Sequence, residues 1–227
     1  MNGKFARRST GVRVLTLVLA FVLVMGASVA GTLAWLSATT GPVVNTFASE
    51  ELFADAENNF KLWENKAEDT DGDGCFTLTE EKVTTNSYSI LPGVNIPKNP
   101  TVEIVGLEEY AYLYIKVTGL PMATGLTATV DADNWTELGA AYPGVYVYIG
   151  EKADSATKVI KATDSNKVTF NATILTDNQV VVDAAYTGAA DDISLSFDAY
   201  MVQATGNGAN AAEAWANTYG APAGEGN

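Results

Sequence analysis

Apolar and polar residues alternate with a period of two through most of the chain beyond its first 34 residues, and this alternation constrains the fold more than any other feature. Polar turns such as Pro92-Gly93 and Asp177-Asn178 separate the alternating stretches. Such a pattern places apolar side chains on one face of a strand. Because no helical stretches lie between them, the sequence predicts an all-β fold, a jelly-roll-like β-sandwich with a barrel as the alternative. The expected strands are 102–105, 110–117, 126–130, 144–149, 158–161, 168–175 and 193–202.

One short helix is expected near the C-terminus. Residues 209–219 are rich in alanine, a strong helix former, and Gly220 follows as a stop signal. We expect Trp215 to pack onto the sandwich. The predicted organisation is then a signal peptide at 1–34, an N-terminal segment at 35–50, a β-sandwich domain at 51–220 with an acidic loop insertion at 69–80, and a flexible tail at 221–227.

The beginning of the chain has the features of an export signal. Lys4, Arg7, Arg8 and Arg13 form a positive region, and an almost unbroken apolar run over 14–30 follows. Small residues then favour cleavage between Ala34 and Trp35, with a cut before Gly31 as the alternative. An uncleaved anchor is a further alternative, but roughly 17 apolar residues span only about 26 Å, slightly short of a bilayer core.

The expected location is therefore outside the cell. We predict a secreted protein at the cell surface or in the extracellular matrix of a bacterium. Its expected partners are a signal peptidase during export and no membrane after cleavage.

The charge balance excludes several classes of partner. Four of the 13 Lys and Arg residues lie in the leader and none of the 27 acidic residues does, so the cleaved chain keeps 9 lysines and a net charge of −18. Phosphate backbones need clustered cations, so a nucleic-acid partner is not expected. The same balance argues against docking on anionic lipid and supplies carboxylates for divalent cations.

Two residue types limit the possible chemistry. The chain has no histidine, which removes the usual zinc proteases, Ser-His-Asp triads and Cys-His dyads, since each needs an imidazole. We therefore expect no zinc and no enzymatic activity. Cys75 is the only cysteine, so no internal disulfide can hold the fold.

An acidic stretch matches the twelve-residue calcium loop of EF-hands. The candidate ligands occupy loop positions 1, 3, 5, 7, 9 and 12, and Gly74 stands at the sharp turn. They are Asp69, Asp71, Asp73, Cys75 through its carbonyl, Thr77 and Glu80. The flanks at 60–68 and 81–88 are compatible with helices or strands. The sequence predicts one structural Ca²⁺; a solvated acidic turn is the alternative.

Several landmarks, in this order along the chain, resemble the TasA and camelysin group of exported proteins. The likeness covers roughly residues 10–219 and rests on the segments 34–36, 45–47, 91–104, 112–117, 134–136, 146–148 and 197–204. The resemblance implies a jelly-roll β-sandwich, cleavage by a dedicated signal peptidase and assembly into fibres of the biofilm matrix. Some members are named as metallopeptidases, but the lack of histidine departs from that role.

Assembly also has a physical rationale. A sandwich leaves edge strands with unpaired N–H and C=O groups, and a neighbour's segment can add a strand there. The N-terminal segment follows a Gly41-Pro42 break and offers Val43, Val44 and Phe47 as apolar anchors. The alternative is that this segment forms the first strand of its own domain, and both arrangements can hold, one in the monomer and one in the fibre.

Two further functions compete with a homo-oligomeric fibre subunit. The first is a calcium-dependent carbohydrate-binding or adhesin module with a matrix polysaccharide as partner. Its stacking residues would be Trp63, Trp135, Tyr142, Tyr146 and Tyr148, if they form an exposed row. The second is a glycosidase with two carboxylates, but with 27 acidic residues a chance pair means little.

Overall fold

The computed structural model describes residues 37–39, 44–47, 52–53, 56–163, 165–187 and 194–220, and for 37–39, 44–47, 56 and 57 it describes the backbone alone. The predicted signal peptide, the cleavage site at Ala34 and Trp35, and the predicted tail lie outside these residues. Strands dominate the described chain, which confirms the all-β prediction. The helical elements within it are α2 (Ala56–Asn59), η2 (Thr176–Asn178) and α3 (Ala211–Tyr219).

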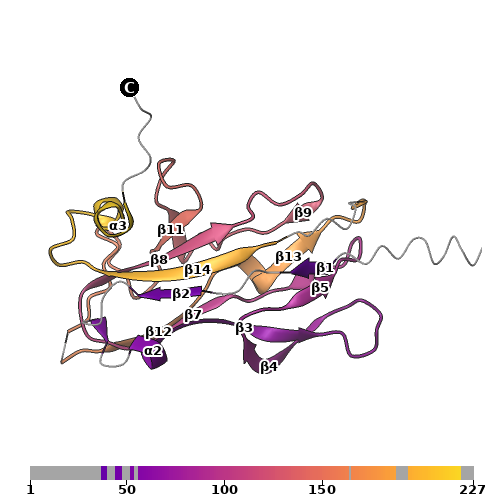
Figure 1. Cartoon of the computed structure of the whole chain (residues 1–227), viewed down its shortest axis with the longest axis horizontal. Helices are drawn as coiled ribbons and strands as arrows, with labels where there is room; N and C mark the ends of the chain where they lie inside the picture. Colours follow the sequence, from indigo (N-terminus) through magenta and orange to yellow (C-terminus); the bar gives the residue numbers. More distant parts are fainter. Residues whose placement is uncertain are drawn as a thin grey trace, which may run out of the picture. The chain divides into compact units, whose positions relative to one another are not determined.

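The strands form four sheets (Figure 1). The largest has the order β10 (Trp135–Glu137), β11 (Val145–Tyr148), β8 (Ala111–Thr118), β14 (Ser196–Gln203) and β2 (Val44–Phe47). The second has the order β12 (Val168–Thr173), β7 (Thr101–Leu107), β3 (Phe60–Glu68) and β4 (Thr77–Val83). Two smaller sheets contain β6 (Ile96–Pro97), β13 (Gln179–Val182) and β9 (Leu126–Thr127), and β1 (Ser37–Thr39) with β5 (Ser87–Ser89).

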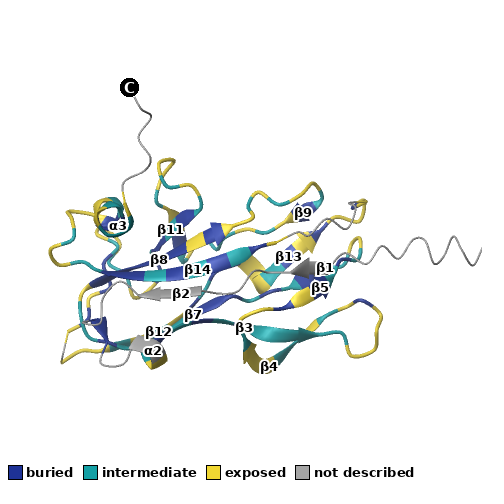
Figure 2. Ribbon diagram, in the orientation of Figure 1, coloured by how far each residue is buried: buried dark blue, intermediate teal, exposed yellow. Residues whose placement is uncertain are grey.

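The two largest sheets share one apolar core, so the fold is sandwich-like. Alternate residues of each strand enter this core, as the period-two pattern requires. Figure 2 shows the resulting buried stretches along β7, β8 and β14. The inward-facing residues of these strands and of β3 include Phe60, Leu62, Val102, Ile104, Leu113, Ile115, Phe197, Ala199 and Met201.

A second apolar cluster lies where α3 covers the five-stranded sheet. Asn210 caps this helix by accepting a hydrogen bond from the backbone N–H of Glu213 at 3.0 Å. Trp215 is buried, and its ring centroid lies 5.1 Å from that of Tyr114 and 5.1 Å from that of Tyr200. The Tyr114 hydroxyl donates to the carbonyl of Ala211 at 2.7 Å. The helix and the packing of Trp215 were both predicted and are confirmed.

The strand predictions succeed in the interior of the sheets and fail near turns. The strands expected at 102–105, 110–117, 144–149, 168–175 and 193–202 correspond to β7, β8, β11, β12 and β14. The strand expected at 158–161 is wrong, because Lys158 has a φ of 65° and Ile160 makes only isolated bridges, to Ala111 and Ala153. The strand expected at 126–130 is reduced to β9. Both flanks of the acidic loop are strands, β3 and β4.

Candidate functional site

The N-terminal segment pairs with its own domain in this structure. β1 runs antiparallel to β5, with Ala38 opposite Tyr88. β2 runs parallel to β14, with Val44 opposite Asp198 and Phe47 opposite Met201 (Figure 1). Of the predicted assembly residues, Val44 and Phe47 lie in β2, and Val43 lies outside the described residues. The segment thus takes the first-strand arrangement that the sequence analysis left open.

β2 occupies the edge of the five-stranded sheet. It contributes four residue pairs with β14, whereas β8 on the other side of β14 contributes eight. Without β2, the edge of β14 would present unpaired N–H and C=O groups, which template the addition of another strand. The N-terminal segment therefore covers an edge that is otherwise open to a neighbour.

A buried ion pair between Lys98 and Glu64 lies beside β5 and β14, the two strands to which the N-terminal segment pairs. Lys98 Nζ is 2.8 Å from Glu64 Oε2, and the two side chains are only 3% and 2% exposed. The same Nζ lies 5.7 Å from the ring centroid of Tyr88 in β5 and 5.7 Å from that of Phe197 in β14. These are the two strands to which β1 and β2 pair. The ion pair thus links β3 to the segment after β6, and its lysine lies beside one ring of each strand to which β1 and β2 pair.

The environment of the pair is apolar and its hydrogen bonding is incomplete. Oε1 of Glu64 has no hydrogen-bond partner among the described residues. Burial lowers the pKa of Lys98, against the opposing effect of the Glu64 charge. Burial also raises the pKa of the Tyr88 hydroxyl, and the charge of Glu64 adds to that rise. A single charge left here would destabilise the fold, because each member of the pair has only the opposite charge of the other to offset its removal from water.

The acidic loop joins β3 to β4 and gathers three carboxylates. Oxygens of Asp69, Asp71 and Asp73 all lie within 4.8 Å of one another. The backbone N–H groups of Gly72 and Gly74 donate to Asp69 at 2.8 and 3.0 Å, and the N–H of Cys75 donates to Asp73 at 2.7 Å. The last bond is the main cause of a lowered pKa at Asp73. Hard oxygen ligands at this spacing fit a divalent cation such as Ca²⁺.

Glycine is required at the turn of this loop. Gly74 has a φ of 84°, in the left-handed region that glycine adopts without steric cost. A Cβ at this position would lie 2.3 Å from Cδ1 of Leu91. Gly74 therefore packs tightly against the side chain of Leu91.

The structure does not bring every expected ligand to the cluster. Cys75 is exposed and lies two residues after Asp73 in the chain, and Thr77 begins β4 opposite Glu68. Glu80 lies three residues further along the same strand, about 10 Å at 3.3 Å per residue. An EF-hand continues into a helix that returns its last ligand to the ion. Because an extended strand follows here, Glu80 is not part of the group of three.

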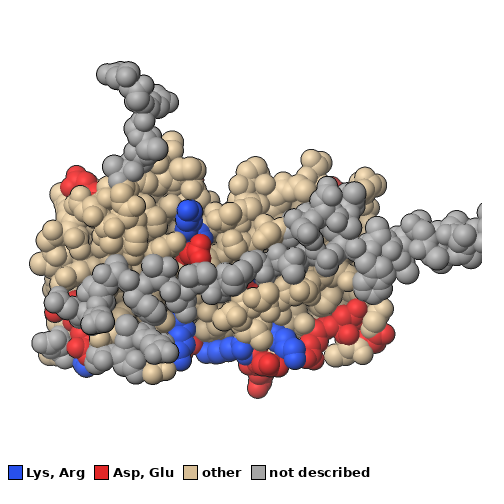
Figure 3. Space-filling model, in the orientation of Figure 1, with Lys and Arg blue, Asp and Glu red and all other residues tan. Residues whose placement is uncertain are grey.

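The charged side chains near this hairpin form a recognisable surface. In the space-filling view, acidic side chains gather at the end of this face that carries the hairpin, with lysines beside them (Figure 3). Lys66, for instance, pairs with Glu68 at 2.9 Å and with Glu81 at 3.1 Å. The lysines neutralise part of the strand surface and leave the loop aspartates negative.

The aromatic residues named for sugar binding do not form an exposed row. Trp135 and Tyr148 are buried in the core, with ring centroids 5.4 Å apart. Trp63, Tyr142 and Tyr146 are half-buried. The ring of Trp63 is covered by Lys82, whose Nζ is 4.0 Å from the ring centroid. The five rings therefore do not form the exposed row that the sugar-binding alternative requires.

Within the described part of the chain, no helix has both the length and the apolar character needed to cross a membrane. Comparisons with protein-family models, with curated proteins and with solved structures find no match to this chain.

Proposed function

We propose that the chain is a secreted structural subunit of a bacterial cell-surface or biofilm-matrix fibre. In the fibre, the N-terminal segment of one copy adds a strand to the β14 edge of the next. The observation that supports this best is the place of β2, a short parallel strand at the edge of the largest sheet. The order of landmarks that resembles the TasA and camelysin group agrees with it, and by that resemblance we infer a jelly-roll connection of the strands.

Exchange of β2 between copies needs no new kind of contact. The four residue pairs that β2 makes within its own chain are the same pairs that a neighbour's β2 would make. Swapping an identical element between protomers is a low-cost route to association, and a head-to-tail swap that does not close gives a filament. The main-chain hydrogen bonds would provide affinity, and Val43, Val44 and Phe47 would set the register.

Calcium would have a structural role in this subunit. We propose that Asp69, Asp71 and Asp73 hold one Ca²⁺, with the Cys75 carbonyl and Thr77 as further candidate oxygens. The ion would neutralise the carboxylates and stiffen the β3–β4 hairpin. Extracellular calcium modules typically bind at about 10⁻⁴–10⁻³ M, which is sufficient outside a cell.

The experiment compares two chains by electron microscopy. One begins at Trp35 and the other at residue 48, so that it lacks the N-terminal segment. We expect filaments from the first and folded monomers from the second, with the fold of both checked by circular dichroism. A chain that lacks only residues 221–227 is the matched control and should still form filaments.

A peptide of residues 35–47 sharpens the test. Added in trans, it should cap growing ends and shorten the filaments, whereas a peptide with Val43, Val44 and Phe47 changed to Ser should not. If both long and truncated chains stay monomeric with calcium and with seeding, the fibre function is wrong and the adhesin function replaces it.

A further inference from the structure

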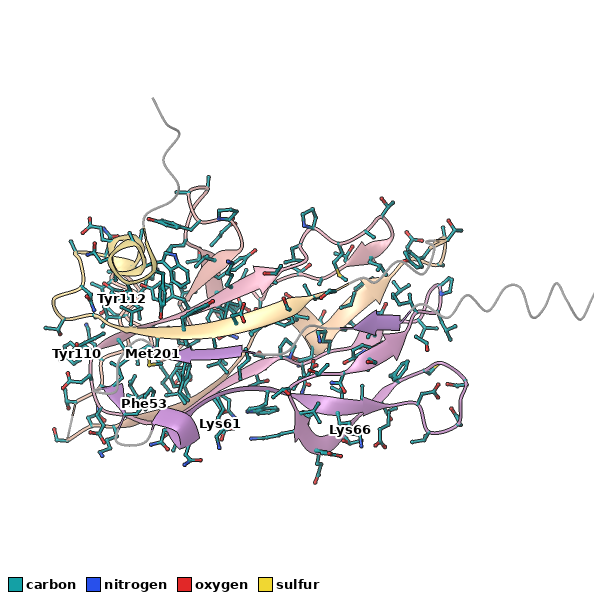
Figure 4. The ribbon with its side chains drawn as sticks, viewed as in Figure 1. Phe53, Lys61, Lys66, Tyr110, Tyr112 and Met201 are labelled. Carbon is teal, nitrogen blue, oxygen red and sulfur yellow. The ribbon has the colours of Figure 1, made fainter. Side chains whose placement is uncertain are left out.

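A shallow pocket of about 370 Å³ lies at the start of β8, just beyond the point where Ala111 pairs with Gln203 at the end of β14. Its described lining comes from three loops that are distant in sequence: Glu109 and Tyr110 precede β8, Thr205 follows β14, and Ala162, Thr163 and Ser165 precede β12. Figure 4 labels Tyr110 at this end of β8. The volume is at the small end of the range for ligand pockets, which suits one small cyclic molecule.

Tyr110 differs from every other described aromatic side chain. It is 40% exposed, while the other nine tyrosines and all described Trp and Phe side chains are buried or half-buried. Single exposed apolar side chains are normal on a protein surface, so the exposure of Tyr110 matters here because its ring lines a pocket. Exposed aromatic rings at a pocket are characteristic of surfaces that bind a partner with an apolar face.

The backbone at Tyr110 is held on both sides. Its carbonyl accepts a hydrogen bond from the N–H of Ala204 at 2.7 Å. The next residue, Ala111, exchanges two hydrogen bonds with Ile160, at 3.1 and 2.8 Å. The ring therefore projects from a fixed position, so a ligand that stacks on it loses little free energy to ordering of the chain.

Apart from Ala162, the remaining described lining is polar and carries no positive charge. It offers the hydroxyls of Thr163, Ser165 and Thr205 and the carboxylate of Glu109. The flanking lysines are engaged: Lys161 pairs with Asp154 at 2.6 Å, and Lys167 pairs with Glu108. Hydroxyls and a carboxylate can exchange hydrogen bonds with a polyol, whereas an anionic ligand would meet Glu109 and a net charge of −14 over the whole chain.

We propose that this pocket binds one unit of a neutral saccharide. The apolar face of a pyranose would stack on the Tyr110 ring, and its hydroxyls would bond to Glu109 and to the Thr and Ser hydroxyls. Ala162, fully buried, forms the floor. None of the lining residues pairs with β2, so the proposal does not rest on fibre formation.

Calorimetric titration of the chain beginning at Trp35, before filaments are allowed to form, tests the proposal. The probes are three hexasaccharides: a neutral glucan, an N-acetylglucosamine oligomer and a uronic acid oligomer. We expect binding of at least one of the first two and none of the third. Binding of none of them, or of the uronic acid oligomer alone, overturns the proposal.

Variants of the pocket locate the site. Tyr110→Ala should weaken binding at least tenfold, while Tyr110→Phe, which keeps the ring, should stay within about threefold of the wild type. Thr85→Ala, an exposed threonine between β4 and β5, is the matched control and should not change the affinity. Tyr110→Phe and Thr85→Ala should melt at the wild-type temperature, and circular dichroism should show that Tyr110→Ala, which loses a ring that is 40% exposed, is folded at the titration temperature. Undiminished binding by Tyr110→Ala would show that the saccharide binds elsewhere and that the assignment is wrong.

Discussion

The two sides of strand β14 differ in the length, direction and surroundings of the strand that pairs there. On one side, β8 runs antiparallel over the full eight residues of β14, and its Leu113 and Ile115 are completely buried. On the other side, β2 runs parallel over four residues at the edge of the sheet. One side is built into the core and the other is a short added strand. The comparison shows that one strand can pair with a long core strand on one side and with a short edge strand on the other.

The largest loss of stability should come from breaking the buried ion pair of Lys98 and Glu64, which lies beside the strands to which the N-terminal segment pairs. Lys98→Met leaves Glu64 as an unpaired buried charge, which should lower the free energy of unfolding by about 3–5 kcal/mol. The double change Glu64→Leu with Lys98→Met should recover most of that loss, since no charge remains. Urea unfolding measures both. A loss below about 1 kcal/mol for Lys98→Met would contradict the buried position of the pair.

The stability of the protein should be nearly as sensitive to substitutions on the side of β14 that pairs with β8. Ile115 lies opposite Ala199 and is fully buried, so Ile115→Ala removes core volume and should destabilise the chain by about 2–5 kcal/mol. Thr118→Ala, at the exposed end of the same strand, is the matched control and should stay within about 0.5 kcal/mol. Equal effects of the two changes in urea unfolding would mean that β8 is not part of the core.

Calcium should have a smaller effect, remote from both sides of β14. At a concentration 100 times the Kd, one bound Ca²⁺ stabilises the fold by about 2.7 kcal/mol, seen as a higher Tm. Asp69→Ala should abolish this shift. Glu80→Ala should keep it, because Glu80 lies along β4 and outside the group of three carboxylates. No shift in the wild type would remove calcium from the account, and loss of the shift in Glu80→Ala would favour a full EF-hand ligand set.

The sequence predicted β8, on one side of β14, well, but it did not indicate which strand β2 would pair with. The Tyr110–Val117 stretch alternates clearly and is rich in aromatic and β-branched residues, so local pattern and tertiary burial agree for β8. β2 has only four residues, and nothing in so short a run says which strand it joins or in which direction. The pairing of β2 depends on the free edge of β14, which exists only once the sheet is folded.

The candidate site was predicted in its residue types but not in its geometry. The spacing of Asp69, Asp71 and Asp73 was sufficient to bring them together, because the loop closes on itself through local hydrogen bonds. The loop pattern put Glu80 at position 12, but a charged stretch such as 77–83 does not distinguish helix from strand, and in the structure it is the strand β4. The pairing of Lys98 with Glu64 spans 34 residues, and no local signal marks it.

The most direct test of strand exchange traps β2 against β14 with a disulfide. Val44 and Asp198 are opposite each other, and neighbouring strands lie about 4.8 Å apart, within the range that a disulfide spans. Two variants are made in a Cys75→Ser background, one with Val44→Cys and one with Asp198→Cys, and they are mixed before filaments are allowed to form and are oxidised. If β2 adds to the neighbour, a disulfide-linked pair of chains forms from the mixture and from neither variant alone. If β2 stays in its own domain, the mixture yields no linked chains, only a chain carrying both changes forms the disulfide, and strand exchange is contradicted.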